Sequence, residues 1–317
     1  MVACRMKETK QEHQSVLLTE VVDALAIQPA GVYVDVTFGR GGHAQAILDR
    51  LGPTGRLLAM DKDPDAIAYA SQHFSHDKRF HIHHGSFAEL EQFVIGQGVL
   101  GKVNGILFDL GVSSPQLDEA ERGFSFMRSG KLDMRMDYST GVDAATWIAS
   151  VSEQALANVL YEYGEERFSR RIARAIVTAR QEAAITTTEQ LAEIIAKAHP
   201  AWQPGKHPAT RSFQAIRIAV NHELDELELG LKQALSALTI TGRLLVISFH
   251  SLEDRIVKHF MQHQERSDQF PAKLPVKHQS YLPTFKRLGR AIKPGVEEIS
   301  SNPRARSAVL RVGEKLS

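Results

Sequence analysis

A short stretch near the N-terminus, Val32 to Ala44, constrains the fold more than any other part of this chain. It begins with β-branched valines that favour a buried strand, and the glycines Gly39, Gly41 and Gly42 then leave room for a tight turn and a ligand. Apolar residues at helical spacing follow the turn. The stretch therefore predicts a strand, a glycine turn and a helix, with a cofactor site at the turn.

The glycine spacing leaves two other interpretations open. Gly39-x-Gly41-x-x-Ala44 fits the dinucleotide fingerprint, and Asp61 follows about twenty residues later at the end of the next expected strand, as in a nicotinamide-dependent dehydrogenase. The same glycines could instead form a turn that binds no ligand, because a short pattern of this kind is weak by itself.

Strands and helices alternate through the first third of the chain, as they do in a doubly wound α/β sheet. The expected strands are Val32 to Val36, Arg56 to Met60, Phe80 to His83 and Gly105 to Leu110. Ligands bind such sheets outside the carboxyl ends of the strands. The residues that we expect on this rim are Asp35, Asp61, Gly85-Ser86-Phe87 and Asp109.

After Pro115 the strand pattern gives way to amphipathic helices for about a hundred residues, which predicts an inserted all-helical domain. Apolar residues recur from Phe213 to Leu238 as in one long helix, with Gly230 as a possible kink. Arg243 to Phe249 then has the composition of a central parallel strand, and Ala308 to Val312 predicts a last edge strand.

Composition narrows the class of protein. The 317 residues are 43% hydrophobic, as in an ordinary globular protein, which excludes disorder and fibres. Cys4 is the only cysteine, so an intrachain disulfide is impossible and a reducing compartment fits. Residues 1–14 lack an apolar signal core, and the longest apolar runs are far too short to span a bilayer. We expect a soluble, cytoplasmic protein without a membrane partner.

Positive charge is concentrated locally although the net charge is only +1. Arginines recur at helical spacing in one segment, beside the aromatic residues Tyr161, Tyr163 and Phe168, which could stack on splayed RNA bases. Such a stripe can also be a merely solvated helix face. The candidate RNA-binding residues are Arg167, Arg170, Arg171, Arg174, Lys206, Arg211, Arg304 and Arg306.

Asp109 ends an apolar strand, and the next loop carries Ser113, Ser114 and Gln116. Carboxylate and hydroxyl acceptors at one strand end suit an amine substrate, because they can hold its N–H groups and direct its lone pair. A plain Ser-Pro turn is the alternative. His43 begins the helix after the glycines, where it could contact a ribose or a carboxylate. The other histidines have no Cys or Asp that completes a ligand set, so no metal is predicted.

Several long motifs occur in one order and closely resemble the bacterial MraW family, also called ribosomal RNA small-subunit methyltransferase H. They are Phe38-Gly39-Arg40-Gly41-Gly42-His43, Asp109-Leu110-Gly111-Val112-Ser113-Ser114-Pro115-Gln116-Leu117-Asp118, Glu121-Arg122-Gly123-Phe124-Ser125-Phe126, Leu132-Asp133-Met134-Arg135-Met136-Asp137, Ser248-Phe249-His250-Ser251-Leu252-Glu253-Asp254-Arg255 and Asn302-Pro303-Arg304-Ala305-Arg306-Ser307. The resemblance runs from about His13 to Val312.

The resemblance implies a Rossmann-like, S-adenosylmethionine-dependent methyltransferase domain, residues 1–117 and 218–317, interrupted by a helical substrate-recognition domain, residues 118–217. The implied reaction methylates the exocyclic N4 amine of a cytidine in the decoding region of 16S ribosomal RNA. The cofactor contacts that it implies are Gly41, Gly42, His43, Asp61, Phe87, Asp109 and Gln116.

We expect direct methyl transfer, with Asp109, Ser113 and Ser114 as the catalytic residues that hold the amine hydrogens or take the proton. Many amino-methyltransferases carry Asp/Asn-Pro-Pro-Tyr/Phe at this strand end, and this chain does not. The aromatic residue that stacks on the base is therefore open among Phe124, Phe126 and Phe249.

The expected partner is small-subunit ribosomal RNA within an assembled or assembling subunit, and a homodimer is possible. Two further interpretations stay open from the sequence alone. One is a DNA amino-methyltransferase, which would share the core chemistry. The other is a non-catalytic RNA-binding module with a vestigial pocket.

Overall fold

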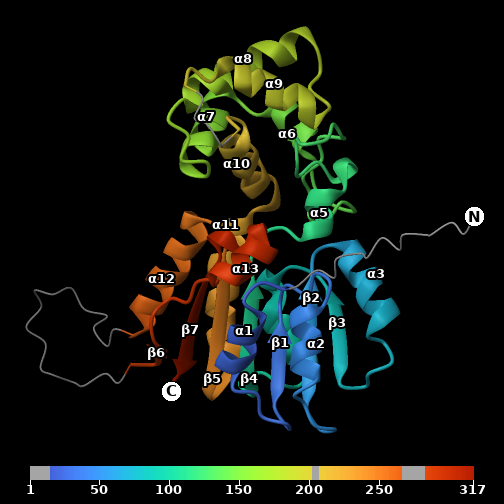
Figure 1. Ribbon diagram of the computed structural model, residues 1–317, viewed down its shortest axis with the longest axis vertical. Coiled ribbons are helices and arrows are strands. Elements are labelled where there is room, and N and C mark those ends of the chain that lie inside the picture. Colours follow the sequence, from blue (N-terminus) through green and yellow to red (C-terminus); the bar gives the residue numbers. More distant parts are fainter. Residues whose placement is uncertain (1–14, 202–206, 266–282) are drawn as a thin grey trace, which may run out of the picture.

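The computed structural model describes residues 15–201, 207–265 and 283–317, and its centre is one seven-stranded sheet (Figure 1). The strand order is β3-β2-β1-β4-β5-β7-β6, and every neighbouring pair is parallel except those that β7 makes with β5 and β6. The strands are β1 (Val32–Asp35), β2 (Arg56–Asp61), β3 (Phe80–His84), β4 (Val103–Asp109), β5 (Leu238–Ser248), β6 (Phe285–Arg287) and β7 (Val309–Lys315).

Both faces of the sheet are buried, as expected for parallel strands covered by helices. Leu57 and Ala59 of β2 face one apolar cluster, and Leu58 and Met60 face the other. Helices α1 (Leu18–Leu25), α2 (Gly42–Leu48) and α3 (Pro64–His73) contribute to the first cluster, and α4 (Leu90–Gly96), α11 (Glu223–Ala237) and α12 (Ser251–Glu265) to the second. In the described part of the chain, no helix is long and apolar enough to cross a membrane.

A third apolar cluster belongs entirely to the helical insert, with members from Phe124 to Ile216. Helix α5 (Ser114–Asp118) leads from the end of β4 into this insert, which lies beyond one end of the sheet (Figure 1). Its other helices are α6 (Ala144–Ser150), α7 (Glu153–Glu162), α8 (Ser169–Glu182), α9 (Thr188–Ala198) and α10 (Thr210–Asn221). These features confirm the predicted fold class, a Rossmann-like α/β sheet with an inserted helical region.

The prediction of one long helix from Phe213 to Leu238 is wrong. The chain breaks between α10 and α11 at His222, which adopts the left-handed conformation with φ of 54°. The side chain of Asn221 fixes this break, because it donates to the carbonyl of Met134 and accepts from the N–H of Met136, each at 2.7 Å. Tertiary hydrogen bonds that no local pattern reveals therefore replace the helical continuation.

Gly230 lies within α11 and does not mark a boundary of that helix. A Cβ at this position would come 3.0 Å from the Phe87 ring and 3.2 Å from the Phe108 ring. The glycine thus allows α11 to lie close against the Phe87 and Phe108 rings, which is a packing role, and the kink stays a prediction.

The prediction that the last strand lies at an edge is also wrong. β7 lies between β5 and β6, and the three-residue β6 forms the edge. Phe285 of β6 is fully buried. Three residues carry too little periodicity to predict a strand, so only the pairing in space identifies β6. The remaining short elements are η1 (Phe87–Glu89), η2 (Ala120–Arg122), α13 (Val296–Ser301) and η3 (Pro303–Ser307).

Candidate active site

The glycine turn after β1 has the backbone geometry that its sequence predicts. Gly39 and Gly41 have φ of 56° and 73°, a region that residues with a Cβ rarely adopt. A Cβ on Gly41 would also come within 2.8 Å of the rings of Phe38 and Phe74. The turn therefore needs glycine for conformation and for space, and it leads directly into α2.

Asp61, at the end of β2, holds this turn in place. Its Oδ2 accepts the N–H of Gly39 at 2.7 Å, and its Oδ1 accepts the N–H of Asp63 at 2.9 Å. Burial raises the pKa of Asp61 to about 6, although these two hydrogen bonds oppose the rise. A carboxylate at this strand end, held by the cofactor turn, is a suitable acceptor for ribose hydroxyls.

Asp109 lies at the end of β4 with an unsatisfied acceptor. Its Oδ1 is buried and has no hydrogen-bond partner among the described residues. Its Oδ2 lies 3.6 Å from Nδ1 of His43, and its own N–H donates to the Thr37 hydroxyl at 2.6 Å. Burial raises the pKa of Asp109 well above its usual range, and the charges of Asp35 and Glu253 raise it further. An unpaired buried oxygen is costly, so this atom is ready to accept a hydrogen from a bound molecule.

His43 is neutral, and its surroundings select one tautomer. Burial lowers its pKa to about 4, and its Nε2 lies 3.1 Å from the carbonyl oxygen of Val16. A carbonyl can only accept, so Nε2 carries the hydrogen and Nδ1 presents a lone pair to Asp109. Nδ1 of His43 is therefore a nearby acceptor for a proton on Asp109.

Asp35 lies behind Asp109 as a second buried carboxyl group. It is 1% exposed and accepts the N–H of Thr37 at 3.1 Å. Burial raises its pKa to about 7, and the charge of Asp61 adds to the rise. The rim thus collects Asp35, Asp61 and Asp109 as expected, in surroundings that disfavour their negative charge.

Gln116 is buried and connects the loop after β4, which carries Ser113, to the residues that follow β2. Its Oε1 accepts the N–H of Ser113 at 2.8 Å, and its Nε2 donates to Oδ2 of Asp63 at 2.7 Å. Ser113 precedes α5 and Ser114 begins it, so the amide of Gln116 fixes the loop that carries both hydroxyls. Its predicted contact with the cofactor stays a prediction.

Asp63 and Arg122 are site residues that the sequence analysis did not single out. Nη1 of Arg122 lies 2.9 Å from Oδ2 of Asp63 and 2.9 Å from Oδ2 of Asp65, and both Asp63 and Arg122 are buried. The pair joins the insert to the strand end that carries Asp61. An aspartate before Pro64 was the available signal, since Asp is a favoured N-cap and Pro a favoured first helical residue.

The aromatic residues that are candidates for stacking on the adenine or on the target base lie in different parts of the structure. Phe87 follows β3, and its ring lies 5.5 Å from that of Phe108. Phe249 lies beside the loop after Asp109, because a Cβ on Gly111 would be 3.6 Å from its ring. Phe124 belongs to the core of the insert, and Phe126 packs there against Phe213 at 4.7 Å. Phe249 is therefore the candidate closest to the loop that follows Asp109.

The predicted basic residues do not form one cluster. Arg167, Arg170 and Arg171 line a cavity of about 540 Å³ in the insert, together with Tyr161 and Phe168. Other members have protein partners: Arg174 pairs with Glu153, Arg211 donates to the carbonyl of Glu165, and Arg304 pairs with Asp118. Arg306 is exposed in η3, and Lys206 lies outside the described residues.

The residues at this rim fit S-adenosylmethionine on structural grounds. The glycine turn leaves space that a Cβ would fill, Asp61 ends the second strand, and Asp109 offers a buried oxygen without a partner. A Rossmann-like sheet with the reversed strand β7 between β5 and β6, together with this rim, is the arrangement expected of an S-adenosylmethionine-dependent methyltransferase.

The chain belongs to the MraW methylase family, whose model matches residues 10–316. It is 57% identical to ribosomal RNA small subunit methyltransferase H of Pseudoalteromonas atlantica, over 97% of this chain and 99% of that protein. It is 55% identical to the protein of the same name from Coxiella burnetii, over 97% of this chain and 100% of that protein.

Among solved structures, an rRNA methylase from Streptococcus thermophilus aligns with a TM-score of 0.43 at 11% identity, over 94% of this chain and 95% of that one. Membership of the methylase family confirms S-adenosylmethionine as the cofactor. It also sets aside the dehydrogenase interpretation of the glycine turn.

Proposed function

We propose that this enzyme transfers a methyl group from S-adenosylmethionine to the exocyclic N4 amine of a cytidine in the decoding region of 16S ribosomal RNA. The names of relatives at 55–57% identity support small-subunit ribosomal RNA as the substrate class. The amine as the target follows from the acceptors at the end of β4.

The observation that carries the proposal is the buried, unpartnered Oδ1 of Asp109 beside a loop with two hydroxyl groups. An exocyclic amine has two hydrogens and a lone pair that is delocalised into the base. Asp109 with Ser113 or Ser114 can hold both hydrogens, which localises the lone pair and directs it away from the acceptors. A hydroxyl substrate would leave one of these acceptors unused.

Bound S-adenosylmethionine supplies an electrophilic methyl group on its sulfonium. We propose that the residues that hold it are Gly41, Gly42, His43, Asp61, Phe87, Asp109 and Gln116. Asp61 would accept the ribose hydroxyls, while the tight turn at Gly41 lets the backbone approach the methionine end. Phe87 offers a ring face for the adenine.

Asp109 takes the proton that the amine loses as it is methylated. Its raised pKa makes the carboxylate a stronger base than an exposed aspartate. The lone pair on Nδ1 of His43 lies 3.6 Å from Oδ2, and a small approach of the two side chains would let it accept a hydrogen bond from the protonated carboxyl group. Phe249, beside Gly111, is the residue that we propose to stack on the cytosine.

Substrate recognition belongs to the insert, residues 118–217, and methyl transfer to residues 1–117 and 218–317. The cavity lined by Arg167, Phe168 and Tyr161 combines guanidinium groups with aromatic faces, which suits phosphates and unstacked bases. An RNA target favours action in the cytoplasm, on the assembled or assembling small subunit. A homodimer is a further proposal, and sedimentation of the full chain tests it.

The test is transfer of labelled methyl from the cofactor into small subunits that lack the modification, followed by mass mapping of the RNA. We expect incorporation at one cytidine, with far less into naked RNA. Asp109→Asn should lower the rate of incorporation about 10²–10⁴-fold while calorimetry still detects cofactor binding. Asp23→Asn, which changes an exposed carboxylate in α1, is the control. Absence of label from every cytidine would overturn the proposal.

A further inference from the structure

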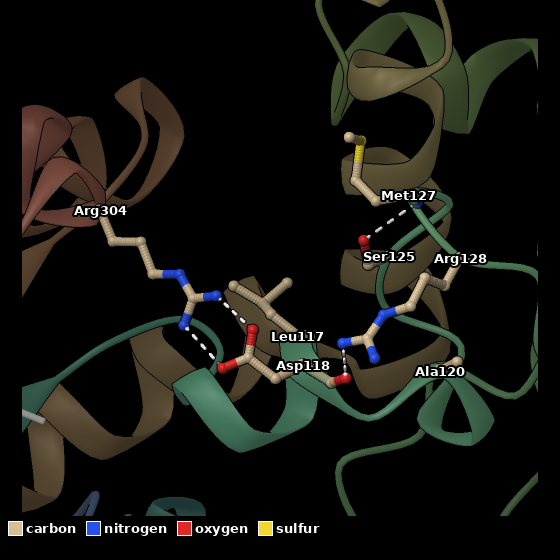
Figure 2. A pocket seen from close by; sticks show the side chains of 7 residues that line it. All are labelled: Leu117, Asp118, Ala120, Ser125, Met127, Arg128 and Arg304. Carbon is tan, nitrogen blue, oxygen red and sulfur yellow. Dashed lines mark hydrogen bonds and ion pairs between the residues drawn. The ribbon is translucent and has the colours of Figure 1, made fainter. Parts of the chain in front are cut away.

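A second cavity lies where the insert meets the C-terminal segment, close to the catalytic loop (Figure 2). Its volume is about 220 Å³, and its walls come from α5, from the loop after η2 and from η3. Leu117 forms part of one wall, and Met127, 83% exposed, forms part of another. The cavity therefore joins segments that are far apart in the sequence.

Two arginines reach one aspartate across this cavity. Arg304 contacts both carboxylate oxygens of Asp118, at 2.6 and 3.4 Å. Arg128 donates from the opposite side to the backbone oxygen of Asp118 (Figure 2). Arg304 thus holds a planar oxyanion in the two-pronged geometry with which guanidinium groups also bind phosphate.

The ion pair between Arg304 and Asp118 is open to exchange. The two side chains are 41% and 53% exposed, so water screens their attraction. Exposed pairs of this kind contribute little to folding, and a phosphate of higher charge can replace the carboxylate. Asp118 therefore occupies a place that another anion can take.

The cavity is also near the residues of the reaction. Asp118 ends the five-residue α5 that begins at Ser114, so about 7.5 Å of helix separates the cavity from the catalytic loop. An RNA strand whose target base lies near Ser114 would bring its adjoining backbone over the cavity. The apolar side chain of Met127 at the rim gives a neighbouring ribose or base a surface on which to pack.

We propose that this cavity binds a backbone phosphate of the substrate RNA beside the target nucleotide, and that Asp118 occupies Arg304 until the phosphate replaces it. Arg128 and Arg304 are the donors, and Asp118 is an internal competitor. This inference rests on the proposed RNA substrate. Loss of Arg304 should therefore weaken RNA binding, whereas loss of the Asp118 charge should strengthen it.

The test is equilibrium binding of the full chain to small subunits that lack the modification, at several salt concentrations. Arg304→Gln should weaken binding about tenfold and reduce the salt dependence by about one phosphate. Asp118→Asn should instead tighten binding about threefold, since it removes the competitor. In the double variant, Asp118→Asn should give no gain, because its effect acts through Arg304.

Arg287 and Glu265 form a matched control pair, with side chains 37% and 33% exposed. Arg287→Gln and Glu265→Gln should change RNA binding less than either cavity variant. Thermal melting and cofactor binding should match wild type for all variants, which separates recognition from folding.

Equal weakening by Asp118→Asn and Arg304→Gln would overturn the proposal, because a structural ion pair loses the same contact from either side. Unchanged RNA binding in both variants would overturn it too. If the opposite effects appear but no methyl group is transferred, the proposed reaction fails while the phosphate site stands. Wild-type protein that does not bind these small subunits would refute both.

Discussion

The buried carboxyl group of Asp35 makes the stability of this protein depend on pH in a predictable direction. Burial raises its pKa from 3.8 to about 7. Between these values the folded chain keeps a proton that the unfolded chain has lost, so the free energy of unfolding falls as the pH rises from about 4 to 7. Above pH 7 Asp35 is ionised in both the folded and the unfolded chain, so its effect on the free energy of unfolding no longer changes with pH.

Asp35→Asn removes this dependence while keeping an oxygen that can accept the N–H of Thr37. A pKa difference of one unit corresponds to about 1.4 kcal/mol, so the rise of about three units has an upper bound of about 4 kcal/mol. About 3 kcal/mol of this upper bound applies between pH 5 and pH 8. Local relaxation and water entry make the real effect smaller. We therefore expect the free energy of unfolding of Asp35→Asn, relative to wild type, to rise by about 1–2 kcal/mol between pH 5 and pH 8.

Urea denaturation followed by far-ultraviolet circular dichroism at pH 5, 6, 7 and 8 measures the effect. Trp147 lies in α6 of the insert, so its fluorescence would not report on the sheet. Hydrogen exchange in β1 should show the same trend with pH. Asp23→Asn, in an exposed position, should give a difference that does not vary with pH. A gain for Asp35→Asn that is constant, or that shrinks as the pH rises, would refute the reasoning.

Three other substitutions test the rim. Gly41→Ala should lower the free energy of unfolding by about 2–4 kcal/mol, because the new Cβ clashes with two rings and strains the backbone. Gly98→Ala is the control: its φ is also positive, at 70°, but its surroundings are open, so it should cost only about 1–2 kcal/mol. Similar melting temperatures for the two variants would contradict this reasoning. Asp109→Asn should lower the methylation rate about 10²–10⁴-fold and weaken cofactor binding much less. An equal loss of rate and of cofactor affinity would assign Asp109 to cofactor binding alone. Arg122→Met should lower the unfolding free energy by about 3–5 kcal/mol, because it leaves the buried carboxylate of Asp63 without its cationic partner. Adding Asp63→Asn should recover part of this loss, and no recovery in urea titrations would exclude the ion pair as the cause.

The parallel strands could be predicted because both their faces are buried. Continuous apolar runs, each ending in an acidic or glycine-rich segment, are local features, and Asp61 and Asp109 end the strands where these runs end. The glycine turn was predictable for the same reason, since its φ values depend on the residues of the turn itself.

The breaks and close contacts could not be predicted in this way. His222 adopts a left-handed conformation because Asn221 bonds to a loop 85 and 87 residues away in sequence, and an apolar helical pattern continues across it. Gly230 looks like a kink in the sequence because its neighbours across the interface, Phe87 and Phe108, come from other elements.

The fold class, the glycine turn and the acidic strand ends can be predicted from local sequence, because strand periodicity and glycine conformation are local properties. The way in which these groups act together depends on contacts that form only in the folded chain. The tertiary structure set the tautomer of His43 through the carbonyl of Val16, left Oδ1 of Asp109 without a partner, and paired Arg304 with Asp118 across 186 residues of sequence. Hydrogen bonding and burial act over a few ångströms in space, so their partners are known only when the chain has folded.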